Sequence, residues 1–150
     1  TAEAVAQAVV ELKTIPSTGP FIDFRASSAQ VQAAVGDTLQ LAAADALTLD
    51  IAVYAPDWLP ITHVELLRAG EVIEQWDATT VPSVSLDPSR ALWFEHHMTV
   101  QSDADTWYVV QVRGDGDLAP IYPDVWPWAL TAPIFVDVGG DGYDAAPPRR

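Results

Sequence analysis

The chain has 150 residues, 49% hydrophobic and 19% charged, which is enough apolar sequence for one domain around a single core. Its formal net charge of −14 works against the phosphate attraction that drives nucleic-acid binding, so DNA and RNA are excluded as partners. The uncharged apolar runs are shorter than the roughly 20 residues that span a bilayer. The lack of cysteine excludes disulfides, a thiolate nucleophile and sulfur metal ligands, and leaves the cellular compartment open.

Residues 2–13 predict one short amphipathic helix. Val5, Val9 and Leu12 recur at helical spacing, and the surrounding residues are good helix formers. The helix is expected to end before the cluster of proline, serine, threonine and glycine at 16–20, because a residue before proline is disfavoured in the α region.

The pattern then changes to alternating or short continuous apolar runs, which are typical of strands. The predicted strands are residues 21–26, 38–42, 47–54, 62–68, 71–77, 92–100, 107–113 and 134–138. Ala69-Gly70 joins two of them, and a two-residue link with glycine predicts a tight hairpin over residues 62–77.

Short strands with turn signals between them, and no helices in the middle of the chain, predict an all-β fold. We expect an immunoglobulin-like antiparallel β-sandwich over residues 20–144, a leading helix and linker over 1–19, and a C-terminal tail over 145–150. The acidic segment before residues 107–113 is typical of a tyrosine corner, with Trp107 or Tyr108 as its aromatic residue. An ordinary acidic loop before a buried strand is the alternative.

No catalytic residue can be assigned in this chain. The adjacent His96 and His97 alternate across a strand, His63 is distant in sequence, and no His-x-His pair exists to place two imidazoles on one face. The serines lie in no Gly-x-Ser-x-Gly turn, and the many acidic residues single out no acid and base pair.

The segment after the last predicted strand is similar to part of a calcium loop. Such loops place carboxylates at positions one, three and five, and glycine at position six. Asp137, Asp141 and Gly142 match positions one, five and six, whereas Gly139 and Pro148 replace two further ligands. We expect a glycine-rich turn, and a degenerate calcium site at Asp137 and Asp141 is the alternative.

Six tryptophans is a high number for this length. Trp126 and Trp128 flank a proline in a proline-rich segment that also contains Tyr122, and Trp58 lies in another loop. One interpretation of these aromatic residues is an exposed platform for sugar rings or a proline-rich ligand. The other interpretation is that the proline-fixed loop folds its tryptophans back onto one open end of the sandwich.

Six segments in a fixed order carry a resemblance to a known family. They are TGPFI at 18–22, GDT at 36–38, VYAPDW at 53–58, VELLRAGE at 64–71, DTWYVVQVRG at 105–114 and ALTAPIFVD at 129–137. With these segments the chain resembles the C-terminal domain of the CehA/McbA family of metallohydrolases, enzymes related to the PHP phosphoesterases. Ala132 and Gly139 depart from the asparagine and aspartate that the family pattern has at those positions.

The resemblance implies a catalytic domain with His-x-His, Glu and Asp-x-His metal ligands, and it slightly favours a location outside the cytoplasm. None of those ligand motifs occurs in this chain, so catalysis cannot be carried over to any of its residues. The expected function is a non-catalytic accessory domain that packs against a PHP-like catalytic domain, supplied by the same precursor or by a separate chain. Only that catalytic domain is expected to hold a divalent metal. The alternative is a free-standing binding module that recognises a glycan or a peptide through Trp58, Tyr122, Trp126 and Trp128.

Overall fold

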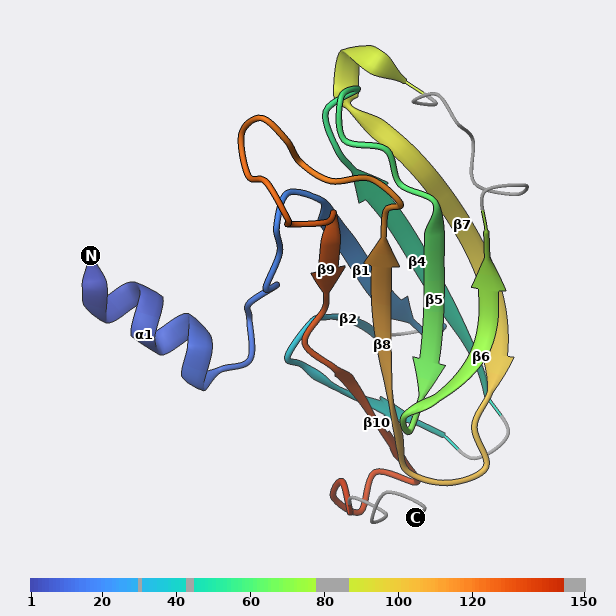
Figure 1. The fold of residues 1–150 in the computed structure, drawn as a ribbon. Coiled ribbons are helices and arrows are strands. Elements are labelled where there is room, and N and C mark those ends of the chain that lie inside the picture. The colour runs from blue at the N-terminus through green and yellow to red at the C-terminus, as the bar shows by residue number, and fades with distance from the viewer. Residues whose placement is uncertain (30, 43–44, 78–86, 145–150) are drawn as a thin grey trace.

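A computed structural model describes residues 1–29, 31–42, 45–77 and 87–144. In these residues two sheets face each other across one core (Figure 1). The first sheet has the order β2 (Gln32–Ala34), β1 (Phe21–Ser27), β4 (Ala46–Tyr54) and β7 (Leu92–Gln101). The second has the order β3 (Thr38–Leu41), β10 (Ile134–Val138), β8 (Thr106–Arg113), β5 (His63–Arg68) and β6 (Glu71–Trp76), with β9 (Trp128–Leu130) also paired to β8. A short 3-10 helix, η1 (Pro88–Arg90), precedes β7.

The chain crosses repeatedly between the two sheets, so the expected immunoglobulin-like β-sandwich with one short N-terminal helix is confirmed. All the predicted strands are present, with ends within a residue or two of those expected. One pairing differs from the expected antiparallel arrangement, because β3 runs parallel to β10.

Two three-residue strands, β2 and β9, were not predicted. The break between β9 and β10 has a local cause at Thr131, whose hydroxyl accepts the Val110 amide while its own amide donates to the Val110 carbonyl, each at 3.0 Å. Pro133 follows and has no amide to add to the ladder. The two segments therefore act as one interrupted strand beside β8.

Strand alternation places the core. Along β4, Leu47, Leu49, Ile51 and Val53 are almost completely buried, and the residues between them face outward. Trp93 is buried as well, and its indole Nε1 donates to the Ala55 carbonyl at 2.9 Å. A large aromatic side chain thus fills the core while its polar atom is satisfied.

The corner before β8 takes its aromatic residue from Tyr108. The Tyr108 hydroxyl and the Ser102 hydroxyl are 2.9 Å apart, and both residues are buried. A tyrosine corner fixes the start of such a strand by a bond to a residue a few positions upstream, here made to a side chain. Trp107 instead points to the other side of the strand, over Gly70.

The predicted hairpin is confirmed as β5 and β6. Ala69 and Gly70 form its turn with φ of 50° and 85°, and two positive φ values are the signature of the tight turn that suits twisted strands. Glycine takes the second position without cost, whereas Ala69 adopts a conformation that is uncommon for a residue with a Cβ.

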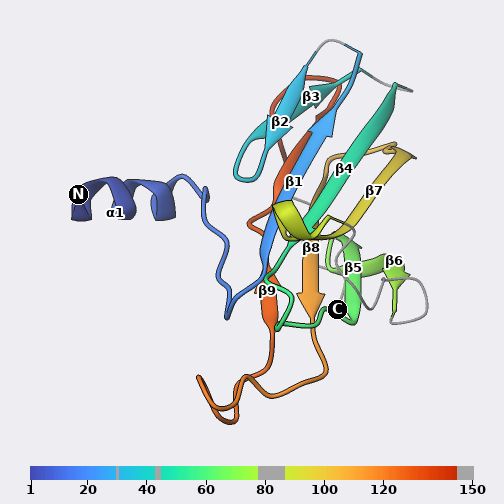
Figure 2. The ribbon, with the colours of Figure 1, turned by 90° about the horizontal axis from the view of Figure 1, so that it is seen from above.

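The helix α1 (Ala2–Val10) projects away from the sandwich (Figures 1 and 2). Thr1 caps its N-terminus, where the Thr1 hydroxyl accepts the Ala4 amide at 3.3 Å, and the helix ends earlier than the predicted residue 13. Leu12 already has a φ of 57°, which is outside the right-handed helical region. None of the residues of α1 is buried. Among the described residues no helix has the length and apolarity needed to cross a membrane.

Candidate functional site

A surface hollow of about 320 Å³ lies where β5 begins and β8 ends. Its lining is formed by His63, Arg113, Gly114, Asp115, Trp126, Pro127 and Trp128, and we call it the tryptophan hollow. His63 and Arg113 are direct partners in the pairing of β5 with β8, which places their side chains next to each other on one face of the sheet.

Two backbone contacts bring the tryptophan segment to this sheet end. The Gly114 amide donates to the Pro127 carbonyl at 2.9 Å, and Gly114 is buried. A Cβ added to Gly114 would lie 2.2 Å from the Pro60 carbonyl oxygen, so only glycine allows this approach. The segment before β1 makes the second contact through Thr18, whose hydroxyl donates to Trp126 O at 2.7 Å and accepts the Trp128 amide at 2.8 Å.

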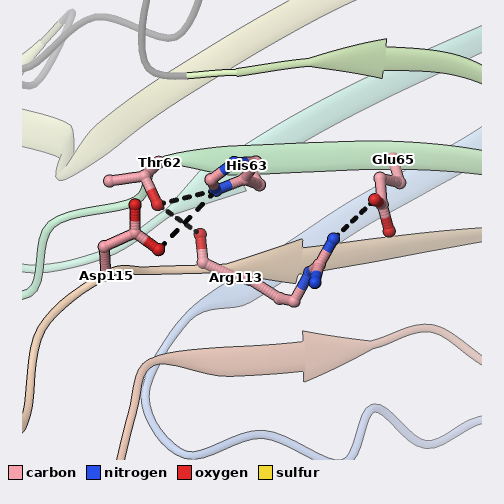
Figure 3. Close-up of polar contacts among 5 residues, drawn as sticks. All are labelled: Thr62, His63, Glu65, Arg113 and Asp115. Atoms are coloured by element: carbon pink, nitrogen blue, oxygen red, sulfur yellow. Dashed lines mark hydrogen bonds and ion pairs between the residues drawn. The ribbon is translucent and has the colours of Figure 1, made fainter.

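Polar side chains lie close together at this end of the sheet (Figure 3). The Thr62 hydroxyl lies 2.9 Å from His63 Nδ1, and an Asp115 carboxylate oxygen lies 3.9 Å from the same nitrogen. A catalytic triad needs the nucleophile and the acid on different nitrogens of the imidazole. Both contacts here use Nδ1, so this arrangement cannot relay a proton from Thr62 to Asp115.

Arg113 supplies the positive charge of the hollow. One of its guanidinium nitrogens donates to Glu65 Oε1 at 2.6 Å, and its side chain is about half exposed (Figure 3). A guanidinium carries five N–H donors, so this contact leaves others for a ligand. Together with Trp126, which is 57% exposed, Arg113 forms a polar and aromatic surface suited to recognition.

The four predicted aromatic residues do not all meet in one place. Trp126 and Trp128 line the tryptophan hollow, and Trp128 is partly buried there. Tyr122 lines a second hollow of about 310 Å³ with Ser17, Thr18 and Val125. Trp58 is 59% exposed and lines neither.

Sequence reasoning did not find His63, Arg113 and Asp115 as neighbours of the tryptophans. His63 was considered only as a metal ligand, and the link between His63 and Arg113 depends on the register of β5 with β8. No local pattern encodes that register, because it is set by the burial of the opposite face of both strands.

The closing turn after β10 is built around two carboxylates. Asp137 is 2% exposed and accepts the Gly142 amide at 3.2 Å, while Asp141 lies exposed in the turn. Asp105 accepts the Asp144 amide at 2.7 Å and the Val138 amide at 2.8 Å. These two bonds lower the pKa of Asp105. These bonds of Asp137 and Asp105 are all to backbone amides and hold the turn. Pro148, one of the two departures from the calcium pattern, lies outside the described residues.

The adjacent histidines point to opposite faces, as alternation along a strand requires. His96 packs on Trp76 with ring centroids 4.7 Å apart, and His97 faces outward beside Asp50. No cluster of three or more His, Cys, Asp or Glu residues suited to a metal ion was found in the part of the chain that the structure describes.

Comparisons with known families, with curated proteins and with solved structures find no match to this chain. Two features of the described residues stand out at this point, the exposed helix α1 and the tryptophan hollow. The first presents exposed valines, and the second combines an exposed tryptophan with a guanidinium.

Proposed function

We propose that this chain is a non-catalytic accessory β-sandwich domain that docks onto a PHP-like catalytic domain of the CehA/McbA type. The catalytic domain belongs to the same precursor or to a separate chain, and it supplies the divalent metal together with all of its ligands. The contribution of the sandwich is structural, because it holds the catalytic domain in place.

The observation that carries this proposal is the exposure of α1. Val5 is 66% exposed and Val9 is 55% exposed, and they lie on one side of the helix. An isolated helix shorter than about 12–15 residues is only marginally stable in water, and α1 has nine residues. Helices of this kind gain stability when their apolar side packs against another surface. A domain that covers Val5 and Val9 provides such a surface.

The C-terminal end of α1 is fixed to the sandwich while its valines stay free. A Cβ added to Gly36 would lie 2.5 Å from the Glu11 carbonyl oxygen, so the chain beyond the helix passes close to this turn. Lys13 Nζ lies 3.6 Å from Asp37, and the Leu130 amide donates to the Pro16 carbonyl at 3.1 Å. A helix attached at one end and apolar along its side is suited to docking at a domain boundary.

The chemistry of the partner comes from the sequence resemblance. Six segments of the chain resemble, in order, the C-terminal pattern of the CehA/McbA family, and we take that C-terminal domain to be a β-sandwich like this one. A second copy of this chain is the competing occupant of the α1 surface, and the experiment below separates the two.

The test measures association of the full chain with a separately expressed PHP-like catalytic domain of the CehA/McbA family, by titration calorimetry and sedimentation. We expect a complex, and we expect the paired change Val5→Gln and Val9→Gln to weaken it at least tenfold. Glutamine is a better helix former than valine, so the helix itself is preserved. Val10→Gln, the same change on a different side of α1, is the matched control.

Two results would overturn the proposal. One is the absence of association with the catalytic domain. The other is sedimentation of the chain as a dimer that the paired valine change dissociates, because that places a second copy of the chain on α1.

A second candidate function rests on the tryptophan hollow. Exposed Trp126 beside Arg113 favours a binding module for a glycan or a peptide. Binding on glycan and peptide arrays that Trp126→Ala abolishes, with Trp58→Ala as the exposed-tryptophan control, would support this function. The binding-module function would gain further support if the paired valine changes left association with the catalytic domain unchanged.

A further inference from the structure

The outer face of the first sheet has a hollow of its own, which shares no lining residue with the tryptophan hollow and none with α1. It occupies about 270 Å³ above β1, β4 and β7, which run side by side (Figure 2). The tryptophan hollow lies on β5 and β8, and α1 belongs to neither sheet. We call this hollow above β1, β4 and β7 the outer-face hollow.

The register of the three strands explains why the face is hollowed. Asp23 on β1 and Glu95 on β7 are both paired with Ala52 on β4 between them. Two strand spacings separate the backbones of Asp23 and Glu95 by roughly 10 Å. The small Ala52 side chain therefore forms a floor between two carboxylates.

The next row of the sheet contains Arg25, Asp50 and His97, again directly paired across the strands. Arg25 donates two bonds to Asp23, each 3.0 Å long, and His97 Nδ1 lies 2.5 Å from Asp50 Oδ1. These contacts hold four planar polar groups in fixed positions around the floor. Arg25 and His97 occupy the carboxylates of Asp23 and Asp50, whereas Glu95 adds a third carboxylate and leaves the hollow net negative.

An aromatic row lies beyond the carboxylates. Tyr54 lines the hollow, and it is paired with Phe21 across the strands, with ring centroids 6.2 Å apart. Phe21 is 55% exposed. The face of an aromatic ring carries negative charge density and attracts the C–H groups of a sugar ring.

We propose that the outer-face hollow binds one neutral sugar residue of a glycan. A sugar hydroxyl can donate to the carboxylates of Asp23 and Glu95 and can accept from the guanidinium of Arg25. A cation could only donate and would meet Arg25, whereas an anion could only accept and would meet Glu95. The neutral polyol is thus the ligand class that uses every group around Ala52.

Neutral sugars are the probes in the test. The full chain is titrated with glucose, galactose, mannose, xylose and N-acetylglucosamine, and with their neutral β-1,4- and α-1,4-linked oligomers, while amide resonances are followed by NMR. We expect at least one of these sugars to shift the amides of Ala52 and its paired neighbours Asp23 and Glu95, with weak affinity in the millimolar range.

Two variants test the site itself. Ala52→Leu fills the floor without changing a charge, and Glu95→Gln removes one acceptor charge but keeps its shape. Each is expected to weaken sugar binding at least tenfold. Thr99→Ala changes the same outer face of β7 outside the hollow and should leave binding unchanged. A thermal melt of each variant shows that the sandwich remains folded.

The proposal fails if no sugar shifts these amides, or if spermidine or heparin binds the face while the neutral sugars do not. It also fails if Ala52→Leu leaves sugar binding intact in a folded protein. Trp126→Ala and the paired valine changes of α1 should not affect this binding, so its failure is distinct from failure of the proposed docking function.

Discussion

Glycine at position 114 is required by contacts on both sides. A Cβ there would meet the Pro60 carbonyl oxygen at 2.2 Å and two side-chain atoms of Pro127 at 2.8 Å. Gly116, two residues later, has only Pro60 Cγ at 3.9 Å. Neither glycine is in the left-handed region, so the difference between the two positions is one of space.

Gly114→Ala is therefore expected to destabilise the fold by about 1–3 kcal/mol, as overpacking of a close contact does. Gly116→Ala should change the stability by much less. Chemical denaturation of the two variants measures both values. Equal and small effects would mean that the loop between β8 and β9 moves aside without cost.

The hydrogen bond between the Tyr108 and Ser102 hydroxyls is expected to stabilise the corner before β8. Tyr108→Phe removes its bond with Ser102 and leaves the Ser102 hydroxyl buried without that partner. The loss is expected to be about 1–2 kcal/mol, measured by urea denaturation. Adding Ser102→Ala to Tyr108→Phe should recover part of the lost free energy of unfolding, because the double variant no longer buries the Ser102 hydroxyl without that partner. If Tyr108→Phe left the stability unchanged, the corner before β8 would not depend on this bond.

His97 gives the chain a pH-dependent contact. Its hydrogen bond to Asp50 is the main cause of a raised pKa, and desolvation opposes it. Because the folded-state pKa is above the unfolded one, this contribution to stability is fully present below the unfolded-state pKa of His97, while Asp50 is ionised. It is lost as the pH rises through the folded-state pKa.

Asp50→Asn is expected to lower the pKa of His97 toward its ordinary value. An NMR titration of the imidazole Cε1–H signal in both proteins measures the change directly. Thr48→Ala, on the same face of β4, serves as the control. The assignment would be wrong if the pKa of His97 were the same with aspartate and with asparagine at position 50.

At the scale of elements, the strands with regular burial could be predicted and the short ones could not. Alternation along β4 and the continuous apolar run of β8 are each strong enough to specify a sandwich strand without knowledge of its neighbours. β2 and β9 have three residues each, and their existence depends on pairing with β1 and β8. In the tryptophan hollow, Trp126 and Trp128 could be predicted as neighbours because they are close in sequence. Arg113 could not, because only the register of the sheet brings it to them.

The helix α1 is shorter than the sequence predicts, whereas the short strands β2 and β9 were additional to the prediction. The periodicity of Val5, Val9 and Leu12 predicted an amphipathic helix through residue 13, but α1 ends at Val10. The backbone turns at Leu12 to bring the chain along Gly36, so the contact with the sandwich decides where the helix ends. Local propensity cannot include a contact made with a turn so far along the chain.

The central position of β8 leads to a strong prediction about that element. Val110 is completely buried between β5 and the β9–β10 side of the sheet. Val110→Asp should place an unpaired charge in the core and cost more than about 3 kcal/mol. Circular dichroism melts should show the loss, with Gln111→Asp as a control on the outward face of the same strand. A melting temperature close to that of the parent would contradict the core position of β8.

At the scale of the whole molecule, the proposed docking function leaves catalysis to another domain. The Thr62, His63 and Asp115 group places both contacts on one imidazole nitrogen and cannot act as a triad. We expect the purified chain to show no turnover of esters, phosphoesters or amides, with or without zinc, manganese or iron. Turnover that persists through purification and disappears with a chelator would contradict this.

Hydrogen exchange of the α1 amides tests the docking role most directly. Segments with few buried contacts exchange with almost no protection, and α1 has no buried residue. We therefore predict rapid exchange over residues 5–10 in the isolated chain and strong protection when the PHP-like catalytic domain is added, with the sandwich strands protected in both. Strong protection of α1 in the isolated monomer, or no gain of protection with the catalytic domain, would contradict the account.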